Sequence, residues 1–438
     1  MARRRGTEGN DTLRGTNADD LLFGLAGNDI LYGRAGDDML SPGTGSDQLF
    51  GGNGDDVAII TELDANTPNT FDGGAGFDTV DLSRLPGDAG GFFFSWSYDS
   101  LTDLYTVERP NTPLEAPTAL SFTGVESVIA TRDNDLIDFA SSSDSMTIRA
   151  GNGDDWVRAG FGRQTVYAGG GDDQIDFGWD RIAFYGNTGD DRIHVSTADS
   201  GFADGGTGYD TIFGGGDVNL ARGYATGSGG SRIAISNFES ISMVGAPDGS
   251  VATGDDNDNL LTGDGWPNNY VFFGRGGNDT VIGGDGADRL SGDTGNDVLD
   301  GGVGDDVLTG GGGADRFRIS DDLFASPTGT DTITDYRRLQ GDRIDLSLVD
   351  ADRGTPFDPD PLHYIGTAAF GARSGEVRWE VRGSDAFVQV DVNGDSAADF
   401  EVRVIGTTTL RRSDFIFADG ATALSGDAPH HPVDVLTG

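Results

Sequence analysis

The sequence repeats itself every nine residues over long stretches. From Gly6 to Ile59 it reads as the nonapeptides GTEGNDTLR, GTNADDLLF, GLAGNDILY, GRAGDDMLS, PGTGSDQLF and GGNGDDVAI. A second array runs from Ala150 to His194, a third runs from Gly274 to Arg318, and single units begin at Gly73 and Gly205. A short fixed period predicts a solenoid, because one repeat can bury its apolar residue only by stacking on its neighbours.

Each repeat joins a glycine-rich part to a short apolar part. Glycines at positions 1, 2 and 4 permit positive φ and close backbone approach, so we expect the first six residues to form a tight turn. The last three should form a short strand whose middle residue, such as Leu13, Leu31 or Leu49, points inward. Two repeats then make one coil, and successive coils stack as parallel strands. The expected fold class is all-β, with tandem parallel β-rolls separated by β-strand excursions and followed by a β-rich C-terminal cap.

An aspartate occupies position 6 of most repeats. Because two repeats make one coil, the aspartates of alternate repeats should stack along one edge of the roll. Carboxylates stacked a few ångströms apart repel one another by several kcal/mol at intermediate dielectric, so this arrangement requires a bound cation. Ligands that are all oxygen favour Ca²⁺ over Mg²⁺ when the coordination is flexible. The candidate metal ligands are Asp11, Asp20, Asp29, Asp38, Asp47, Asp56, Asp78, Asp135, Asp155, Asp173, Asp191, Asp210, Asp258, Asp279, Asp288, Asp297, Asp306 and Asp315.

The middle array should bind calcium along one edge only. Asp155, Asp173 and Asp191 stack on one edge, whereas Gln164 and Ile182 occupy the same repeat position on the other. A neutral amide is a weak calcium ligand and an isoleucine is none. Counting stacked pairs predicts about nine ions in the three arrays. The aspartates at the array ends are additional candidates, and these are Asp78, Asp135, Asp210 and Asp258.

The pattern G-G-x-G-x-D-x-U-x, in which U is a large apolar residue, resembles the RTX (repeats-in-toxin, hemolysin-type) calcium-binding β-roll. The resemblance implies that each Ca²⁺ lies between turns n and n+2. Its ligands would be the position-6 carboxylates of both turns and backbone carbonyls of their glycine-rich loops. Residues 320–417 resemble the C-terminal part of the serralysin family, through phrases such as Asp331-Thr332-Ile333 and Asp414-Phe415-Ile416-Phe417. This second resemblance implies export by type I secretion machinery.

These patterns divide the chain into six segments. They are an N-terminal roll (1–81), an excursion (82–131), a middle roll (132–213), a second excursion (214–253), a third roll (254–318), and a cap with the secretion region (319–438). Both excursions end in similar phrases, Gly124-Val125-Glu126-Ser127-Val128 and Asn237-Phe238-Glu239-Ser240-Ile241, which indicates a duplicated module. The first contains the aromatic run Phe92-Phe93-Phe94-Ser95-Trp96-Ser97-Tyr98, which we expect to form its core rather than a partner-binding face.

The composition argues against several classes of function and structure. The chain has 73 acidic and 29 basic residues, a formal net charge of −44 and no cysteine. So acidic a chain is not expected to bind nucleic acid, whose phosphates require a basic surface. Disulfides and thiolate metal sites need cysteine, and no apolar run is long enough for a transmembrane helix. Met1-Ala2-Arg3-Arg4-Arg5 is not followed by an apolar segment, so no N-terminal signal peptide is expected.

No catalytic motif stands out. None of the four histidines, which are His194, His363, His430 and His431, belongs to an H-E-x-x-H zinc site. A G-x-S-x-G nucleophile elbow is also absent. Asp391, Asn393, Asp395 and Asp399 resemble the first part of an EF-hand loop, but Val402 stands where the loop needs glutamate, so a β-hairpin turn is expected.

We therefore expect a secreted, extracellular or cell-surface protein that folds on Ca²⁺ outside the cell. Its expected role is non-catalytic, as a surface, adhesion or matrix component of the surface-layer type. Expected partners are calcium, further copies of the chain or a cell-surface polysaccharide, and the export machinery. The alternative is an extracellular enzyme acting on polysaccharides from an excursion, with carboxylates about 5–9 Å apart that do not bind calcium.

Overall fold

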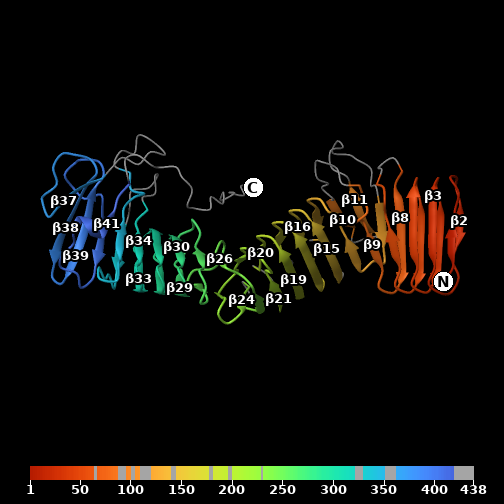
Figure 1. The fold of residues 1–438 in the computed structure, drawn as a ribbon, viewed down its shortest axis with the longest axis horizontal. Helices are drawn as coiled ribbons and strands as arrows, with labels where there is room; N and C mark the ends of the chain where they lie inside the picture. The colour runs from red at the N-terminus through yellow and green to blue at the C-terminus, as the bar shows by residue number, and fades with distance from the viewer. Residues whose placement is uncertain are drawn as a thin grey trace. The chain divides into compact units, whose positions relative to one another are not determined.

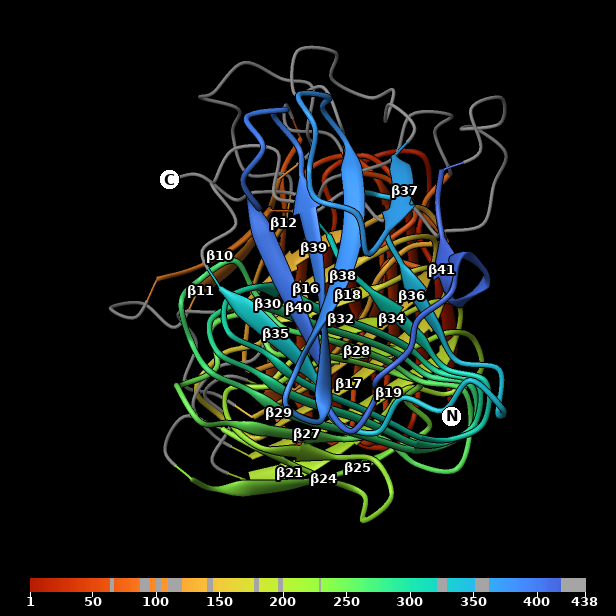
Figure 2. The same cartoon turned by 90° about the vertical axis from the view of Figure 1, so that its left-hand side faces the viewer.

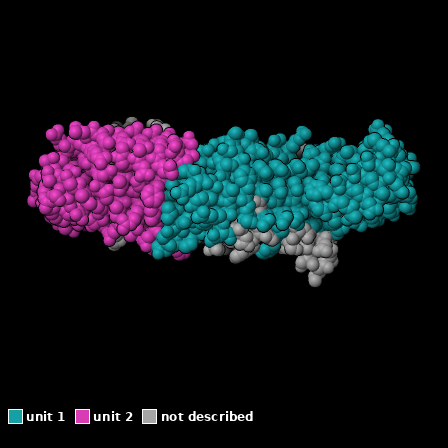
Figure 3. Space-filling model, turned by 90° about the horizontal axis from the view of Figure 1, so that it is seen from below, with its two compact units in different colours: residues 1–254 teal, residues 255–438 magenta. Residues whose placement is uncertain are grey.

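The computed structural model contains two compact units, residues 1–254 and 255–438, which Figure 3 colours separately. The described residues are 1–63, 67–86, 95–99, 104–108, 120–139, 145–176, 181–195, 200–227, 230–320, 329–350 and 362–418. Within them, β-strands dominate and the one helical element is the 3-10 turn Arg412–Asp414. None of these segments forms a helix with the length and hydropathy that a membrane crossing requires. The all-β prediction is confirmed.

Unit 1 begins as a parallel β-roll in which the chain alternates between two sheets (Figure 1). One sheet contains β2 (Thr12–Arg14), β4 (Ile30–Ala35), β6 (Gln48–Asn53) and β8 (Asn69–Ala75). The other contains β1 (Arg3–Arg5), β3 (Leu21–Ala26), β5 (Met39–Thr44), β7 (Val57–Ile59) and β9 (Thr79–Asp81). Leu13 pairs with Leu31, and Leu31 with Leu49, so alternate repeats lie on the same sheet.

The strands are longer than the three residues expected. Where the repeats are complete, as in β3 and β4, a strand spans six residues and continues into positions 1 to 3 of the next repeat. Positions 4, 5 and 6 are left for the turn. Position 2 has a positive φ even where it is not glycine, with 91° at Leu25 and 92° at Arg34. The roll therefore tolerates a side chain at position 2 at some cost in backbone strain.

The two predicted excursions also contribute strands to the roll. β12 (Leu120–Thr123) pairs in parallel with β8, and β13 (Ser127–Ile129) pairs with β9. In the second excursion, β25 (Arg232–Ser236) and β26 (Ser240–Ser242) extend the two sheets in the same way. Antiparallel pairing occurs in the hairpins β10 (Ser95–Asp99) with β11 (Leu104–Glu108), and β23 (Val218–Asn219) with β24 (Tyr224–Thr226). The insertions therefore interrupt the nine-residue period without interrupting the sheets. The side chains of the aromatic run 92–98 lie outside the described residues.

The remaining strands of unit 1 continue both sheets. One side contains β14 (Leu136–Asp138), β16 (Trp156–Arg158), β18 (Gln174–Asp176), β20 (Arg192–His194) and β22 (Thr211–Phe213). The other contains β15 (Met146–Asn152), β17 (Gln164–Gly170), β19 (Arg181–Thr188) and β21 (Ser200–Asp204). β27 (Val251–Thr253) pairs with β23 near the end of the unit.

Unit 2 repeats the plan and ends in a cap. One sheet contains β28 (Leu260–Thr262), β30 (Thr280–Asp285), β32 (Val298–Val303), β34 (Arg316–Arg318), β36 (Arg343–Asp345) and β41 (Phe415–Ile416). The other contains β29 (Val271–Gly276), β31 (Arg289–Thr294), β33 (Val307–Gly312), β35 (Thr330–Ile333) and β40 (Phe400–Val404). β39 (Asp385–Asp391) and β38 (Glu376–Arg382) then join β40 as antiparallel strands, and β37 (His363–Gly366) follows beside β38 (Figure 2).

Inward-pointing side chains at position 8 form the core between the two sheets. Leu22, Leu31, Leu40 and Leu308 are all fully buried. Burying a side chain of this size contributes roughly 1.5–3 kcal/mol, but only once the next coil covers it. The core therefore fixes the register of the coils, and with it the positions of the aspartates that precede each strand.

Candidate metal centres

The position-6 aspartates form rows, as predicted. The backbone N–H of Asp11 donates to Oδ1 of Asp29 at 2.8 Å, and the N–H of Asp29 donates to Oδ1 of Asp47 at 2.8 Å. On the other edge, the backbone N–H of Asp20 donates to Oδ1 of Asp38 at 2.7 Å, and the N–H of Asp38 donates to Oδ1 of Asp56 at 2.8 Å. Each aspartate thus uses one carboxylate oxygen to hold the coil before it.

The second carboxylate oxygen in these rows has no hydrogen-bond donor. Buried oxygens without a partner in the described structure are Oδ2 of Asp29, Asp38, Asp47, Asp56, Asp78, Asp155, Asp173, Asp191, Asp210, Asp279, Asp288, Asp297, Asp306 and Asp315, and Oδ1 of Asp135. An unpaired buried carboxylate oxygen is costly, and it is rare in a folded protein unless an ion completes its shell. The repetition of one orphaned atom in coil after coil indicates a ligand common to all of them.

The orphaned oxygens face space that the first glycine of each repeat leaves open. A Cβ added to Gly33 would lie closer than 3.0 Å to both Asp38 Oδ2 and the carbonyl oxygen of Gly51. A Cβ added to Gly51 would likewise meet Asp56 Oδ2 and the carbonyl oxygen of Gly73. Carboxylate and carbonyl oxygens therefore converge on one small cradle in each coil.

The donor set fits Ca²⁺. No group of three or more His, Cys, Asp or Glu side chains that could hold a metal comes together within the described ranges. Side chains alone therefore do not supply a full coordination shell, and backbone carbonyls must provide the remaining oxygens. A shell of two carboxylates with several carbonyls suits calcium, which takes 6–8 oxygen ligands in flexible geometry.

The electrostatics of the rows show why a cation is needed. Burial, together with the negative charges of neighbouring aspartates, raises the pKa of Asp155 to about 9 and that of Asp56 to about 7. The same causes raise the pKa of Asp191 to about 8 and that of Asp279 to about 7. A neighbouring divalent cation would favour the charged carboxylates instead.

A threonine satisfies the first aspartate in three of the rows. The N–H and Oγ1 of Thr7 donate to Asp11 Oδ2 at 2.6 and 2.8 Å, and Thr16 does the same for Asp20. Thr131 donates both groups to Asp135 Oδ2 at 2.8 Å. In these three rows the first aspartate thus has donors for its Oδ2, although Oδ1 of Asp135 has none, whereas the aspartates that follow have no donor for Oδ2.

One predicted ligand lies outside its row. Leu261 pairs with Val281, which places Asn259 at position 6, and its N–H donates to Asp279 Oδ1 at 2.8 Å. Asp258 is exposed at position 5, where it accepts the N–H of Asn278. The structure therefore does not place Asp258 at the ligand position of the row, because the run Asp255-Asp256-Asn257-Asp258-Asn259 offers more than one phase for the repeat.

Several residues of the rows were missed. Asn69 accepts the N–H of Asp47, Asp331 that of Asp306 and Asp342 that of Asp315. Each stands two residues before a buried apolar residue, as Asp331 stands before Ile333. This spacing was visible in the sequence, but the insertions between coils hid it from a search for a nine-residue period. Tyr270 occupies the same place ahead of Asp288, and its hydroxyl lies 3.1 Å from Asp264 Oδ1.

The two edges of the middle roll carry different residues at position 6, as the sequence indicates. Asp135, Asp155, Asp173, Asp191 and Asp210 form one continuous row through their backbone N–H groups. The other edge places Met146 and Gln164 at the equivalent positions, both buried, followed by Ile182 and Gly201. Calcium binding along one edge only remains a prediction that this geometry favours.

The EF-hand-like segment is the turn between β39 and β40. Asp391 accepts the N–H groups of Gly394 at 2.7 Å and Ser396 at 2.9 Å. Asp399 Oδ2 accepts the N–H of Val392 at 2.6 Å. The loop carboxylates therefore hold the loop's own backbone, as a hairpin turn requires.

The histidines do not form a shared site in the described structure. His194 in β20 stacks on Phe213 at 4.2 Å between ring centroids, and its Nδ1 lies 3.8 Å from Asp176 Oδ1. His363 begins β37. His430 and His431 lie outside the described residues.

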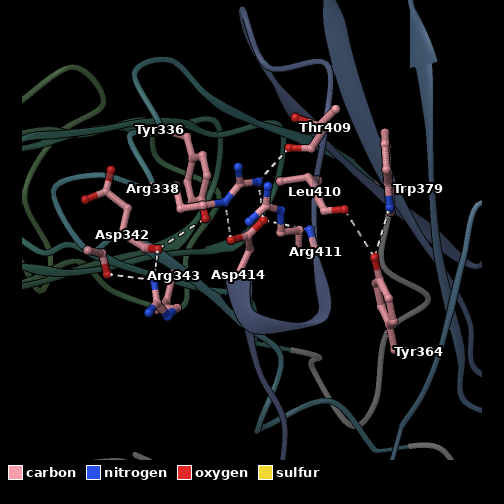
Figure 4. A network of polar contacts seen from close by, with 11 residues as sticks. Tyr336, Arg338, Asp342, Arg343, Tyr364, Trp379, Thr409, Leu410, Arg411 and Asp414 are labelled. Atoms are coloured by element: carbon pink, nitrogen blue, oxygen red, sulfur yellow. Dashed lines mark hydrogen bonds and ion pairs between the residues drawn. The ribbon is translucent and has the colours of Figure 1, made fainter.

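Arginine, rather than a row of aspartates, completes the end of unit 2 (Figure 4). Arg338 donates to both carboxylate oxygens of the buried Asp414 at 2.5 Å and to the carbonyl oxygen of Thr409 at 2.7 Å. Nearby, Trp379 Nε1 donates to the Tyr364 hydroxyl, which donates to the carbonyl oxygen of Leu410. The guanidinium supplies here the positive charge that the rows lack.

Comparison with known families agrees with this geometry. Residues 5–40, 43–58 and 147–181 match the RTX calcium-binding nonapeptide repeat. Residues 272–417 match the peptidase M10 serralysin C-terminal region, which therefore begins just before the third array and includes it, rather than beginning near residue 320. Both predicted resemblances are confirmed. These repeats indicate calcium binding, and repeats and C-terminal region together are typical of secreted proteins.

Similar solved structures were also found, but a search of curated proteins gave no match. The solution structure of the AlgE6R3 subunit of the Azotobacter vinelandii mannuronan C5-epimerase is 30% identical, covers 35% of this chain and 84% of that chain, and has a TM-score of 0.24. The crystal structure of the extracellular lipase LipA from Serratia marcescens is 15% identical, covers 85% of this chain and 67% of that chain, and has a TM-score of 0.22. No curated protein matches the sequence significantly.

Proposed function

We propose that this chain, which carries RTX calcium-binding repeats, is a secreted structural protein whose rolls fold on Ca²⁺ outside the cell. Its role is that of a non-catalytic surface, adhesion or matrix component. The observation that supports this most is the row of buried carboxylate oxygens without donors. Such rows are a poor basis for a stable apo protein and a good basis for one that folds when calcium is supplied.

The residues that would hold calcium are the position-6 aspartates and the carbonyls beside the first glycine of each repeat. When bound, Ca²⁺ supplies the positive charge that the buried carboxylates need. The number of ions should exceed the nine counted from the arrays, because Asp78, Asp135, Asp210, Asp331 and Asp342 extend the rows.

The test uses the full chain in chelator and in millimolar Ca²⁺. Circular dichroism and small-angle scattering should report an expanded chain that is mostly disordered in chelator and a compact β-rich protein with calcium. Electron microscopy of the calcium form should show sheets or filaments that dissolve in chelator. Equal β content in both conditions would contradict calcium-dependent folding, and monodisperse single chains with calcium would contradict self-assembly.

The non-catalytic role has its own test. The alternative enzyme would act on an extracellular polysaccharide, and chromatography of polysaccharides incubated with the calcium-loaded protein would detect its products. We expect none. Reproducible cleavage or epimerisation that elutes with the protein on gel filtration, and is absent from other fractions, would replace the structural role by the enzymatic one.

The proposed export route depends on the C-terminal region. Deleting residues 320–438 should abolish secretion from a host with type I machinery, whereas deleting the repeats 24–59 should not. Immunoblots of medium and cells measure the secretion of both deletion variants. Efficient secretion of the first variant would refute the route.

A further inference from the structure

Two rows of aspartates end on a glutamate. The N–H of Asp78 donates to Oε2 of Glu126 at 2.8 Å, and the N–H of Asp210 donates to Oε2 of Glu239 at 2.9 Å. Elsewhere in the rows the same acceptor is usually an aspartate one coil further on, as Asp78 Oδ1 is for Asp56, and it is Asn69 for Asp47. The glutamates therefore take the place of the next aspartate, although they lie 48 and 29 residues away in sequence.

The oxygen cradle persists at both places. A Cβ added to Gly73 would lie closer than 3.0 Å to Asp78 Oδ2 and to the carbonyl oxygen of Gly124. A Cβ added to Gly205 would meet Asp210 Oδ2 and the carbonyl oxygen of Asn237 in the same way. These are the counterparts of the carboxylate and carbonyl oxygens that converge on each interior glycine.

The shortened turn explains why the residue is glutamate. In a complete repeat five positions separate the first residue from the aspartate, whereas Glu126 follows Gly124 by two positions, as Glu239 follows Asn237. Gly124 and Asn237 both adopt positive φ, 59° and 56°. The register still places Glu126 opposite Asp78 and Glu239 opposite Asp210, and we infer that the extra methylene of glutamate lets its carboxylate reach the row from the shortened turn.

The backbone at both returns is held in the same way. The N–H groups of Glu126 and Ser127 both donate to the carbonyl oxygen of Asp78, at 3.0 and 2.9 Å. Those of Glu239 and Ser240 donate to the carbonyl oxygen of Asp210, at 3.1 and 3.0 Å. Both insertions thus end in the same geometry.

An unpartnered buried oxygen points into each cradle. Asp78 and Asp210 have relative exposures of 0% and 1%, and Oδ2 of each has no donor. A second carboxylate at the same spot adds negative charge to an oxygen that already lacks a partner.

We propose that Asp78 with Glu126, and Asp210 with Glu239, form two further calcium sites, each of which closes a row where the chain returns from an insertion. This inference rests on the proposed calcium-dependent fold and adds two ligands outside the nonapeptide motif. Because the shortened turn contributes fewer carbonyl oxygens, these sites bind Ca²⁺ more weakly than the interior ones. They fasten the returning strands β13 and β26 to β9 and β22.

The experiment counts bound ions on the full chain. Glutamine at either position keeps an oxygen that can accept the aspartate N–H but removes the charge. Equilibrium dialysis at about 1 mM Ca²⁺, the range of extracellular sites, should show one ion fewer for Glu126→Gln, one fewer for Glu239→Gln and two fewer for the double variant. Circular dichroism in calcium should stay unchanged. Glu62→Gln, which removes an exposed carboxylate from the same unit, should bind as many ions as the parent.

A second variant tests the reach of the side chain. Glu126→Asp keeps the charge and loses one methylene, and it should also lose one ion. If the glutamine variants bind as many ions as the parent, or if the double variant loses more than two, the two sites are not as proposed. If Glu126→Asp keeps the ion, the explanation from the shortened turn is wrong. A parent protein that binds no calcium would overturn the proposed function itself, a result distinct from all of these.

Discussion

At the scale of single residues, the two oxygens of an aspartate in the interior of a row, such as Asp173, have different tasks. Oδ1 holds the backbone of the preceding coil, and this bond needs no metal, whereas Oδ2 is buried without a donor. A substitution can therefore separate the two tasks. Asparagine retains an acceptor for the N–H and loses the charge that calcium needs.

Asp173 is the residue at which this separation is clearest, because it stands between Asp155 and Asp191 in the row. At a tenfold excess of Ca²⁺ over Kd one site contributes about 1.4 kcal/mol, so losing two sites costs about 3 kcal/mol. Asp173→Asn and Asp173→Ala should remove that much calcium-dependent stabilisation from the middle roll. Gln164→Ala leaves a cavity but should not change the calcium dependence. Thermal melts at several calcium concentrations measure this difference, and equal calcium dependence of all three variants would contradict it.

The raised pKa values of the row aspartates predict that the calcium-free roll becomes more stable as the pH falls. The pKa values of Asp155, Asp191 and Asp173 in the calcium-free roll are raised to about 9, 8 and 7, above an unfolded value near 3.8, chiefly by burial. Folding without metal therefore takes up protons, so the apo roll gains stability as the pH falls from about 9 towards 4. Calcium-depleted protein should show more β structure by circular dichroism at pH 5 than at pH 8. Less structure at pH 5 would show that these carboxylates are not the obstacle to apo folding.

At the scale of the repeat, the glycines at positions 2 and 4 are both closely packed against the preceding coil. Side chains are present at position 2 in Leu25, Arg34 and Arg275 despite positive φ. At position 4, Gly286 has a φ of 126°, and an added Cβ would collide with the carbonyl oxygen of Asn268. An added Cβ would also collide at position 2, as at Gly52 against the carbonyl oxygen of Arg34, so a change from glycine requires the coils to adjust at either position.

Gly286→Ala should therefore lower the stability of unit 2 by more than about 1 kcal/mol, since both the backbone conformation and the contact oppose the methyl group. Gly265→Ala is the matched control, because Gly265 has no positive φ and nothing lies within 4 Å of an added Cβ. Calcium-saturated thermal melts compare the two. Equal melting temperatures would mean that the coils shift apart at little cost.

The sequence predicted the roll, the row of aspartates and the one-edged middle array because each follows from counting in nines. It did not reveal that Asn69, Asp331 and Asp342 belong to the rows, because insertions of different length precede them. A local spacing is preserved after each insertion, because the row residue still stands two positions before a buried apolar residue. Long-range register, such as Asp78 beside Glu126, depends on which strands pair and needs the folded chain.

At the scale of the whole molecule, charge compensation is uneven. The formal net charge is −44, and most aspartates of the described rows keep one buried carboxylate oxygen without a hydrogen-bond donor. In the C-terminal part of unit 2, arginines take this role: Arg316 contacts Asp345 at 2.5 Å and Arg403 contacts Asp385 at 2.6 Å. The Gly406 N–H and Arg403 lower the pKa of Asp385 to about 2. The rows need calcium to neutralise their charge, and the cap carries its own cations.

This difference predicts that chelation unfolds the chain in part rather than all at once. Hydrogen exchange followed by mass spectrometry at neutral pH should show fast exchange throughout β4 and β6 in chelator, because their coils lose the ions that offset stacked carboxylates. Backbone amides of β38, β39 and β40 should stay protected, since antiparallel pairing and Arg–carboxylate contacts hold them without metal. Calcium should restore protection to β4 and β6 and change β39 little. Loss of protection in β39 to the same degree as in β4 would mean that the cap also depends on the rolls for its fold.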